Sequence, residues 1–313
     1  MRQIHVLAPG LLTTVQDLGR EGFGPMGVSP SGAADPISLR LGNRLVGNDD
    51  ATAALEMTWV GGAFLFPQGA VVALTGSDFA ATLDGVPVEL WTSLKISPNQ
   101  TLRLGQTRSG ARCYLCVQGG IAVQSFLGSA STHILSALGG IEGRKLRKGD
   151  VLDIGDAPEM FQKRKLAEHA KERLAPRKVL RVTPGPQSGW FPQSSLHLFY
   201  RSRYRVTEEA NRMGLRLEGE LIPANFHEEM ITEGVSLGAI QVPDGGPPII
   251  LFVEQQTTGG YPKIANVISV DLPSIGQLLP RDEIQFELVG WESARHMLRQ
   301  QEALLGSKEL ILE

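Results

Sequence analysis

Residues 249–262 read Ile-Ile-Leu-Phe-Val-Glu-Gln-Gln-Thr-Thr-Gly-Gly-Tyr-Pro, a short apolar run that gives way to polar groups. The apolar run predicts a short buried strand, and Gly259-Gly260 permits a sharp turn because glycine has no Cβ. Strand side chains alternate between faces, so Glu254, Gln256 and Thr258 are expected to share one side. So many uncharged hydrogen-bonding groups beside one carboxylate favour a ligand site over a plain strand end.

Short alternating segments of this kind recur along the whole chain, among 36 glycines and 19 prolines. Many short strands bounded by turn residues indicate a β-sandwich or β-barrel architecture, so the fold class is expected to be mainly β. The segments are Leu55–Val60, Val71–Thr75, Leu102–Leu104, Tyr114–Val117, Val151–Ile154, Leu180–Thr183, Val267–Asp271 and Ile284–Val289.

Few helices are expected. Asp35-Pro36 reads as an N-cap followed by proline at the first helical position, and Gly47-Asn48 ends that helix. A second helix is predicted over about 292–305, and a third, charged one near 158–173.

The charged segment 157–178 is the best candidate for a linker between two domains, 1–156 and 179–313. The two halves end alike, because residues 148–155 and 281–288 both place a polar turn with an acid before an alternating strand. Two similar β domains are therefore expected.

Composition excludes several classes of protein. With 313 residues, 42% hydrophobic, the chain is large enough for two well-buried domains. A net charge of −3 and a pI near 6.1 argue against nucleic-acid binding. No apolar stretch approaches the roughly 20 residues that cross a bilayer, and no secretory signal is recognised. Cys113 and Cys116 stand three apart on a strand, which puts the thiols on opposite faces, so structural cysteines and a cytoplasmic setting are expected.

Two familiar motifs are decoys. Residues 22–27 satisfy G-x-G-x-x-G, but Pro25 interrupts the loop and no helix begins there. Residues 234–238 satisfy G-x-S-x-G, but the chain does not run on into a helix. There is no phosphate-binding G-x-x-x-x-G-K-[ST] loop and no Met-Lys-Met biotin-attachment site, and the six histidines show no metal-ligand spacing, so no metal is expected.

Three stretches are denser in polar groups than bulk packing requires: residues 13–20 continuing to 27–35, residues 211–214, and residues 238–243 together with 254–262. Over nearly its whole length the chain resembles the family of the C component of 5-oxoprolinase, also called PxpC/KipA or allophanate hydrolase subunit 2, whose domain recurs in the carboxyltransferase region of urea amidolyase. The motifs that carry the resemblance are Thr14–Arg20, Gly27–Ser29, Ser31–Asp35, Asn43, Leu45–Asn48, Leu55-Glu56, Tyr114, Gly119-Gly120, Leu127–Ser129, Ser131-Thr132, Gly149-Asp150, Asn211–Gly214, Gly238–Pro243 and Gln256–Pro262. The family usually shows Asp-Arg where this chain has Glu254-Gln255, so a carboxylate is kept and a guanidinium is lost.

The resemblance implies two cyclophilin-like β-barrel domains and a role in a heteromeric complex. Its partners would be a KipI-like (PxpB-like) protein and a LamB/YcsF-type (PxpA-like) protein. Such proteins together hydrolyse 5-oxo-L-proline to L-glutamate with ATP, which is used by the complex and need not be bound by this chain. No covalently bound cofactor is expected.

Site roles follow from the chemistry of opening a lactam that carries a carboxylate. Glu254 is expected to act as a general base or orienting carboxylate, with Asn211 as the second catalytic residue. Substrate hydrogen bonds are assigned to Asn211, Gln256, Thr257, Thr258 and Gln241, and Arg212 and Lys263 are available for negative charge. The N-terminal residues Gln16, Asp17, Arg20 and Asp35 would complete the pocket or contact the KipI-like partner.

Two other functions stay open. The first is the carboxyltransferase component of a biotin-dependent urea or amide carboxylase, since urea also presents a planar amide-like group. The second is a KipA-like module without enzymatic activity that sequesters a KipI-like kinase inhibitor.

Overall fold

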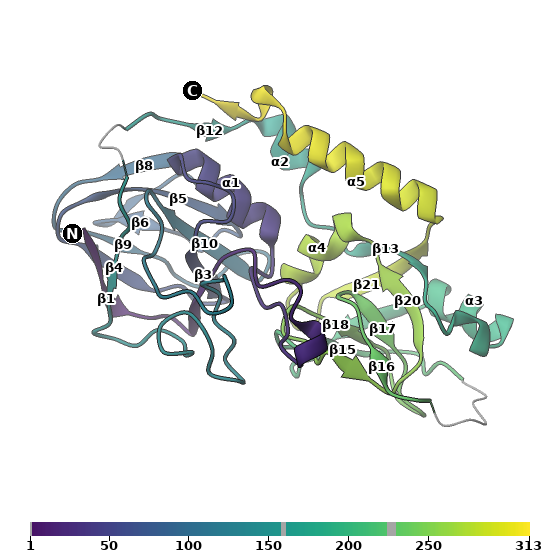
Figure 1. Ribbon diagram of the computed structural model, residues 1–313. Helices are drawn as coiled ribbons and strands as arrows, with labels where there is room; N and C mark the ends of the chain where they lie inside the picture. Colours follow the sequence, from purple (N-terminus) through teal and green to yellow (C-terminus); the bar gives the residue numbers. More distant parts are fainter. Residues whose placement is uncertain (1, 158–160, 224–229) are drawn as a thin grey trace. The chain divides into compact units, whose positions relative to one another are not determined.

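The computed structural model describes residues 2–157, 161–223 and 230–313, and the chain divides into two compact units (Figure 1). The first comprises Ser31–Leu174 together with Met1–Arg20 and Ser307–Glu313. The second comprises Ala175–Gly306 together with Glu21–Pro30. Both consist mainly of strands with a few helices, which confirms the predicted fold class.

The first unit is built on two antiparallel sheets of order β11-β1-β4-β9-β6-β7 and β2-β3-β10-β5-β8. A small pair, β12 with β22, completes it. The strands are β1 (Gln3–Ala8), β2 (Leu12–Gln16), β3 (Ala54–Thr58), β4 (Ala63–Phe66), β5 (Ala70–Gly76), β6 (Thr82–Leu83), β7 (Val86–Pro87), β8 (Ser93–Ile96), β9 (Gln100–Arg103), β10 (Arg112–Val117), β11 (Val151–Asp153), β12 (Lys165–Leu166) and β22 (Ile311–Leu312).

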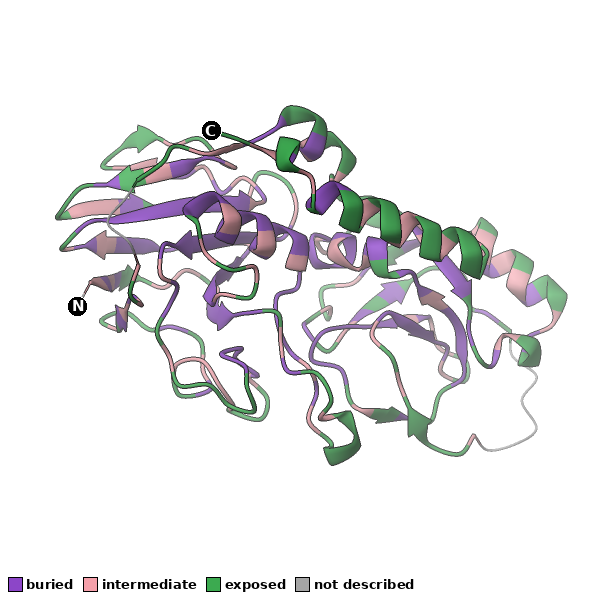
Figure 2. Cartoon of the chain, turned by 45° about the horizontal axis from the view of Figure 1, so that its top comes forward, coloured by how far each residue is buried: buried purple, intermediate pink, exposed green. Residues whose placement is uncertain are grey.

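Strand β10 contributes to two apolar clusters of the first unit. Cys113 belongs to the large core cluster with residues such as Phe64, whereas Cys116 packs in a second cluster with Leu39 of helix α1 (Pro36–Val46). The two free thiols therefore lie on opposite faces, as their spacing predicts. Strand β10 and its neighbour β5 are buried along almost their whole length, and buried strands are coloured purple in Figure 2.

Helix α1 begins and ends where the sequence predicts. The Asp35 carboxylate accepts a hydrogen bond from Ser38 N at 3.0 Å, and Gly47 closes the helix with a φ of 79°. The helix packs closely on the sheet at Gly42, where an added Cβ would lie 2.6 Å from Cys116 Sγ. Only glycine fits at this crossing.

Of the predicted linker 157–178, residues 161–174 belong to the first unit and residues 175–178 to the second, and residues 158–160 lie outside the described residues. The charged helix is shorter than expected: within the described residues, β12 comes first and α2 then covers Glu168–Arg173. Leu166 and Ala170 are buried, which ties this segment to the unit in spite of its charge. The last residues, after helix α5 (Trp291–Leu305) and η4 (Lys308–Leu310), return to pair β22 with β12, so the unit boundaries differ from the predicted domain limits.

The second unit is a closed barrel of order β13-β20-β17-β18-β15-β14-β21, with a separate two-stranded ribbon, β16 with β19. Among the described strands of this unit, β13 and β21 alone pair in parallel. Its strands are β13 (Val179–Pro184), β14 (Arg203–Val206), β15 (Gly214–Glu218), β16 (Glu233–Gly234), β17 (Ala239–Gln241), β18 (Ile249–Leu251), β19 (Thr258–Gly259), β20 (Lys263–Val267) and β21 (Glu283–Leu288). Its helices are η1 (Gly24–Met26), η2 (Ser188–Trp190), α3 (Gln193–Arg201), η3 (Ser269–Asp271), α4 (Leu272–Gly276) and α5.

Each unit contains a turn of the same kind, at the two positions where the sequence predicts one. In the first, Asp150 accepts a hydrogen bond from Arg147 N at 2.7 Å, and in the second, Asp282 accepts one from Leu279 N at 2.9 Å. The residue before each aspartate has a positive φ, 91° in the first turn and 73° in the second. Each turn leads into a strand, β11 or β21, so the similarity between residues 148–155 and 281–288 corresponds to a repeated structural element.

Replacing Gly149 by alanine is expected to destabilise the protein by about 1 kcal/mol, because an L-residue is strained at its φ of 91°. An added Cβ would meet no heavy atom within 4 Å, so the effect is conformational and not steric. Urea unfolding measures it, with Gly234→Ala as the control, since Gly234 also has open space but no positive φ. Equal effects of the two substitutions would contradict the prediction.

Candidate functional site

The second unit carries an open groove of about 890 Å³. Strands β14, β15, β17 and β18, the segments that follow β14, β17 and β18, and the turn before β21 form its walls. Its volume falls within the range of roughly 300–1,000 Å³ that is common for small-molecule sites. Three residues that the sequence assigns to substrate binding or catalysis line it together: Asn211, Gln241 and Gln256.

Gln241 supplies the most informative group in the groove. It is 2% exposed, and its Nε2 has no hydrogen-bond partner among the residues that the structure describes. The register between β17 and β20 shifts between Ile240 and Gln241, an irregularity of the kind that redirects a side chain. The hydroxyl of Thr207, which also lines the groove, likewise lacks a partner within the described part of the chain. An unpaired buried donor costs about 1–3 kcal/mol, so a ligand acceptor here would be stabilised.

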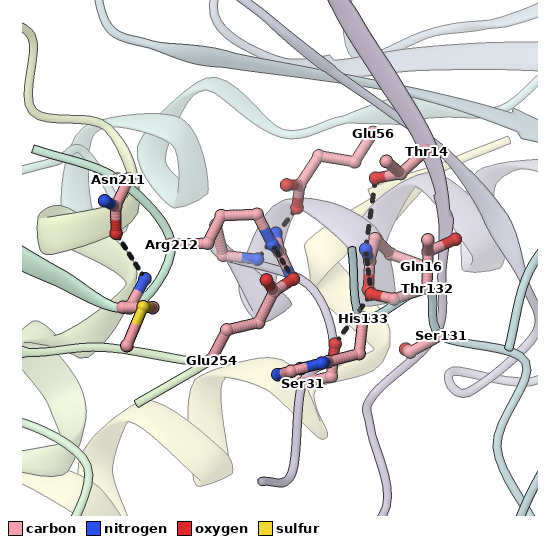
Figure 3. Close-up of polar contacts among 12 residues, drawn as sticks. Thr14, Gln16, Ser31, Glu56, Ser131, Thr132, His133, Asn211, Arg212 and Glu254 are labelled. Atoms are coloured by element: carbon pink, nitrogen blue, oxygen red, sulfur yellow. Dashed lines mark hydrogen bonds and ion pairs between the residues drawn. The ribbon is translucent and has the colours of Figure 1, made fainter. Parts of the chain in front are cut away.

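Asn211 stands in a tight turn beside the groove. Its Oδ1 accepts a hydrogen bond from Met213 N at 2.8 Å, which leaves Nδ2 as the donor of the amide (Figure 3). Met213 and Tyr261 also line the groove and are 37% and 47% exposed. Sequence reasoning missed these two as site residues, although both lie inside the motifs that carry the family resemblance.

Charges on the groove walls occur in opposite pairs. Each of the three arginines that line the groove forms an ion pair with a glutamate that also lines it: Arg205–Glu218 at 3.2 Å, Arg216–Glu209 at 3.3 Å and Arg281–Glu208 at 3.0 Å. These pairs are exposed and each contributes little to stability. Their consequence is a rim without a large excess of either charge.

Glu254 and Arg212 are bound to each other. Arg212 Nε donates to Glu254 Oε1 at 2.5 Å, and both side chains are almost fully buried (Figure 3). The backbone repeats the contact, because Glu254 N donates to Arg212 O at 2.8 Å. Neither residue is among those that line the groove.

The expected alternation of Glu254, Gln256 and Thr258 on one strand face is wrong. Strand β18 ends at Leu251, and a turn follows in which Gln255 N donates to Phe252 O at 2.8 Å. Glu254 is therefore buried, whereas Gln256 and Thr258 are exposed.

Thr257 and Thr258 lie on the β16–β19 ribbon and do not line the groove. Thr257 O accepts from Val235 N at 3.1 Å, and Thr258 pairs with Gly234. Their assignment to substrate binding stays a prediction.

Lys263, at the start of β20, is buried and forms an ion pair with Glu233 of the ribbon. Gln187 joins them, since its Nε2 donates to Glu233 at 2.8 Å and its Oε1 accepts from Lys263 N at 3.2 Å. The lysine charge is thus already balanced, and its direct use on a substrate stays a prediction.

Acid is expected to loosen the ribbon. The hydrogen bond from Lys263, and next that from Gln187, hold the pKa of Glu233 below its ordinary value of 4.5. A carboxyl with a lowered pKa stabilises the fold above its unfolded value and loses that contribution as pH falls through the lower folded value. NMR signals of the Gly234 and Gly259 amides should therefore shift with a midpoint below 4.5. Glu233→Gln should abolish that transition, and its persistence would contradict the assignment.

The N-terminal candidate residues lie in the first unit and form part of its polar interior. Gln16 Nε2 donates to Thr14 Oγ1 and to Thr132 O, both at 3.0 Å (Figure 3). Asp35 is the N-cap of α1, and its second oxygen accepts from Ser38 Oγ at 2.6 Å. Both therefore hold neighbouring backbone in place.

Asp17 and Arg20 anchor the loop around residue 130. The Asp17 carboxylate accepts from Ser129 Oγ at 2.7 Å, Ala130 N at 2.6 Å and Ser131 Oγ at 2.5 Å. Arg20 donates to the carbonyl of Ser131, and its guanidinium lies 5.7 Å from the centre of the Phe126 ring.

Neither a metal site nor a membrane span is found in the described part of the chain. Within residues 2–157, 161–223 and 230–313, no group of three or more His, Cys, Asp or Glu side chains could hold a metal ion. Over the same residues no helix is long and apolar enough to span a membrane. His227 lies outside the described residues.

Known proteins resemble the chain over almost all of its length. The family model "Carboxyltransferase domain, subdomain A and B" matches residues 26–288. The C component of the 5-oxoprolinase of Escherichia coli is 38% identical over 291 residues, which cover 93% of each chain. The urea amidolyase of Saccharomyces cerevisiae is 35% identical over 97% of this chain, but the match spans only 18% of that protein.

A solved structure also has the same fold as this chain. The urea amidolyase of K. lactis superposes with a TM-score of 0.90 at 31% identity, covering 99% of this chain and 21% of that one. The matches confirm the resemblance that the motifs indicate, and the chain belongs to the family of carboxyltransferase domains with subdomains A and B.

Proposed function

We propose that this chain is the C component of an ATP-dependent 5-oxoprolinase, a complex that hydrolyses 5-oxo-L-proline to L-glutamate. The observation that carries the proposal is the buried, unpartnered Gln241 Nε2 in a groove that also holds Asn211 and Gln256. The 38% identity to the C component of a 5-oxoprolinase over 93% of both chains supports it.

The chemistry of a lactam suits these side chains. A five-membered ring forces its amide to be cis, so the C=O and the N–H lie on the same edge of the molecule. A carboxamide side chain carries an acceptor oxygen and a donor nitrogen side by side and can bond to both. Gln241 would bind that edge, and Asn211 Nδ2 and Gln256 would bind the remaining oxygens.

Nucleotide does not fit this groove. A triphosphate needs several uncompensated positive groups or a glycine-rich loop, and each of the three arginines that line the groove pairs with a glutamate. The sequence also has no G-x-x-x-x-G-K-[ST] loop. We therefore assign ATP to the partner proteins, one KipI-like and one of LamB/YcsF type.

Reconstitution tests the proposal. The chain is co-purified with the proteins encoded beside it, and glutamate release from 5-oxoproline is measured with ATP, omitting each protein in turn. Glutamate release that needs this chain supports the function. Full activity without it would overturn the proposal.

A second candidate is the transfer of CO₂ from carboxybiotin to the nitrogen of urea or a related amide. The family match and the 35% identity to a urea amidolyase favour it. An encoded biotin carboxylase and biotin carrier, together with urea-dependent ATP turnover, would distinguish it from lactam hydrolysis. A third candidate, sequestration of a KipI-like inhibitor, predicts tight binding to that protein that groove substitutions leave unchanged.

A further inference from the structure

We propose that Gly259 is a positioning residue of the groove. Because it has no Cβ, the side-chain amide of Gln241 can rest against the β16–β19 ribbon beside the amide of Gln256, and the two amides bind one planar polar ligand together. The inference rests on the proposed function for its catalytic readout. Its structural basis is the place of both amide nitrogens relative to the Gly259 backbone.

Two side-chain amides occupy the space that a Gly259 side chain would need. A Cβ added to Gly259 would lie 2.5 Å from Gln241 Nε2 and 3.1 Å from Gln256 Nε2. The two nitrogens therefore converge on one point, although Gln241 ends strand β17 and Gln256 comes after strand β18. Both glutamines line the groove, whereas Gly259 does not. Gly259 is thus placed to set where these amides stand without touching a ligand itself.

The Gln241 amide cannot stay in place when residue 259 acquires a methyl group. Non-bonded carbon atoms in favourable contact are about 3.5–4.0 Å apart, and 2.5 Å is far inside that range. The new methyl group would also lie 3.1 Å from Cγ1 of Val235, so it is confined between the two side chains. The amide ends a side chain with several rotatable bonds and borders the open groove, so it is the group that moves. Such a movement relieves the clash at little cost in stability.

The Gln241 amide is also the group that a ligand is expected to find. The side chain is 2% exposed, and its Nε2 has no hydrogen-bond partner within the described residues. Pairing of Gly259 with Glu233 and of Thr258 with Gly234 fixes the ribbon backbone against which it rests. Two N–H donors at a set spacing can fix both the position and the orientation of a planar molecule. Displacing the Gln241 amide changes that spacing, so binding weakens although no hydrogen-bonding group is removed.

Gly259→Ala and Gly260→Ala form a matched pair of substitutions. Neither glycine has a positive φ, so each substitution adds one methyl group without backbone strain. A Cβ at Gly260 would lie no closer than 3.5 Å to another heavy atom, the Oγ1 of Thr232, which is an ordinary contact.

The experiment measures lactam opening by the reconstituted complex with each variant. Gly259→Ala should raise KM for 5-oxoproline by about tenfold or more with a smaller change in kcat, and Gly260→Ala should leave both within about twofold. Both variants should keep the melting temperature of the wild type. Equal kinetic effects of the two substitutions, or wild-type kinetics of Gly259→Ala, would overturn the positioning role.

Gln241→Ala tests whether Gly259 acts through this amide. In that background the new methyl group has no Gln241 amide to displace, so Gly259→Ala should change kcat/KM by less than about twofold further. A tenfold loss in both backgrounds would point to a general disturbance of the ribbon, and would overturn the inference.

NMR of the full chain without its partners separates this inference from the proposed function. The Gly259 Hα protons should show an Overhauser contact with the Gln241 side-chain amide, and its absence would overturn the positioning role. Titration with 5-oxo-L-proline and, separately, with urea tests joint binding, because both molecules present a planar amide. Shifts of the Gln241 and Gln256 side-chain signals with either ligand support it, and shifts with neither would overturn it. A response to urea alone would uphold the amide pair while the proposed function fails.

Discussion

Replacing Gln241 by leucine is expected to lower kcat/KM for lactam opening by about 100-fold while leaving the melting temperature unchanged or higher. The loss corresponds to about 2.7 kcal/mol of transition-state stabilisation, the size expected for a buried hydrogen bond that the substrate no longer finds. The stability gain has the same origin, because the Gln241 Nε2 has no partner in the described part of the chain and its desolvation is uncompensated. Leucine has nearly the same volume and removes that penalty.

Gln187→Leu provides the contrast. Both ends of the Gln187 side chain are hydrogen-bonded, to Glu233 and to the backbone of Lys263, so its loss should lower the melting temperature. The two glutamine substitutions should therefore shift the melting temperature in opposite directions, or leave only that of Gln241→Leu unchanged. Wild-type turnover of Gln241→Leu, or a melting temperature several degrees lower, would remove Gln241 from the site.

The features that could be predicted from the sequence are those set by neighbours along the chain. The cap at Asp35, the helix end at Gly47 and the opposite faces of the two cysteines each follow from a few adjacent residues, and the structure has all of them. The repeated turn before β11 and β21 could also be found, because its aspartates bond to backbone only three residues away. The expected strand alternation past Leu251 is wrong because β18 ends there and a turn follows, closed by the hydrogen bond from Gln255 N to Phe252 O.

The candidate site was predictable in composition but not in arrangement. The motifs predict Asn211, Gln241 and Gln256 as polar site residues, and the groove brings them together. The partner of Glu254 could not be foreseen, since Arg212 stands 42 positions away and no periodicity links them. The same holds for Lys263, whose charge is balanced by Glu233 of a separate ribbon. Ion pairs between distant segments therefore decide which predicted polar residues remain available to a ligand.

Asp17→Ala is expected to give the largest loss of stability, about 3–5 kcal/mol, because several buried donors lose their acceptor at once. The Asp17 carboxylate accepts from Gly19 N and Ala130 N and from the hydroxyls of Ser129 and Ser131, at 2.5–2.8 Å. For a unit of this size the melting temperature should fall by roughly 10 °C. Asp49→Ala removes an exposed carboxylate from the same unit and serves as the control, with an expected change near zero.

Asp17→Asn separates the network from a direct role in binding. The amide keeps an oxygen for the three donors to Oδ1 but places an N–H group opposite Ala130 N, so about half of the destabilisation should remain. If Asp17 instead contacted substrate or the KipI-like partner, both substitutions would lower turnover or complex formation at an unchanged melting temperature. Thermal unfolding and co-purification on the same samples decide between these roles. A carboxylate that accepts from four donors within its own unit has little capacity left for a ligand, which is why the loss should be one of stability.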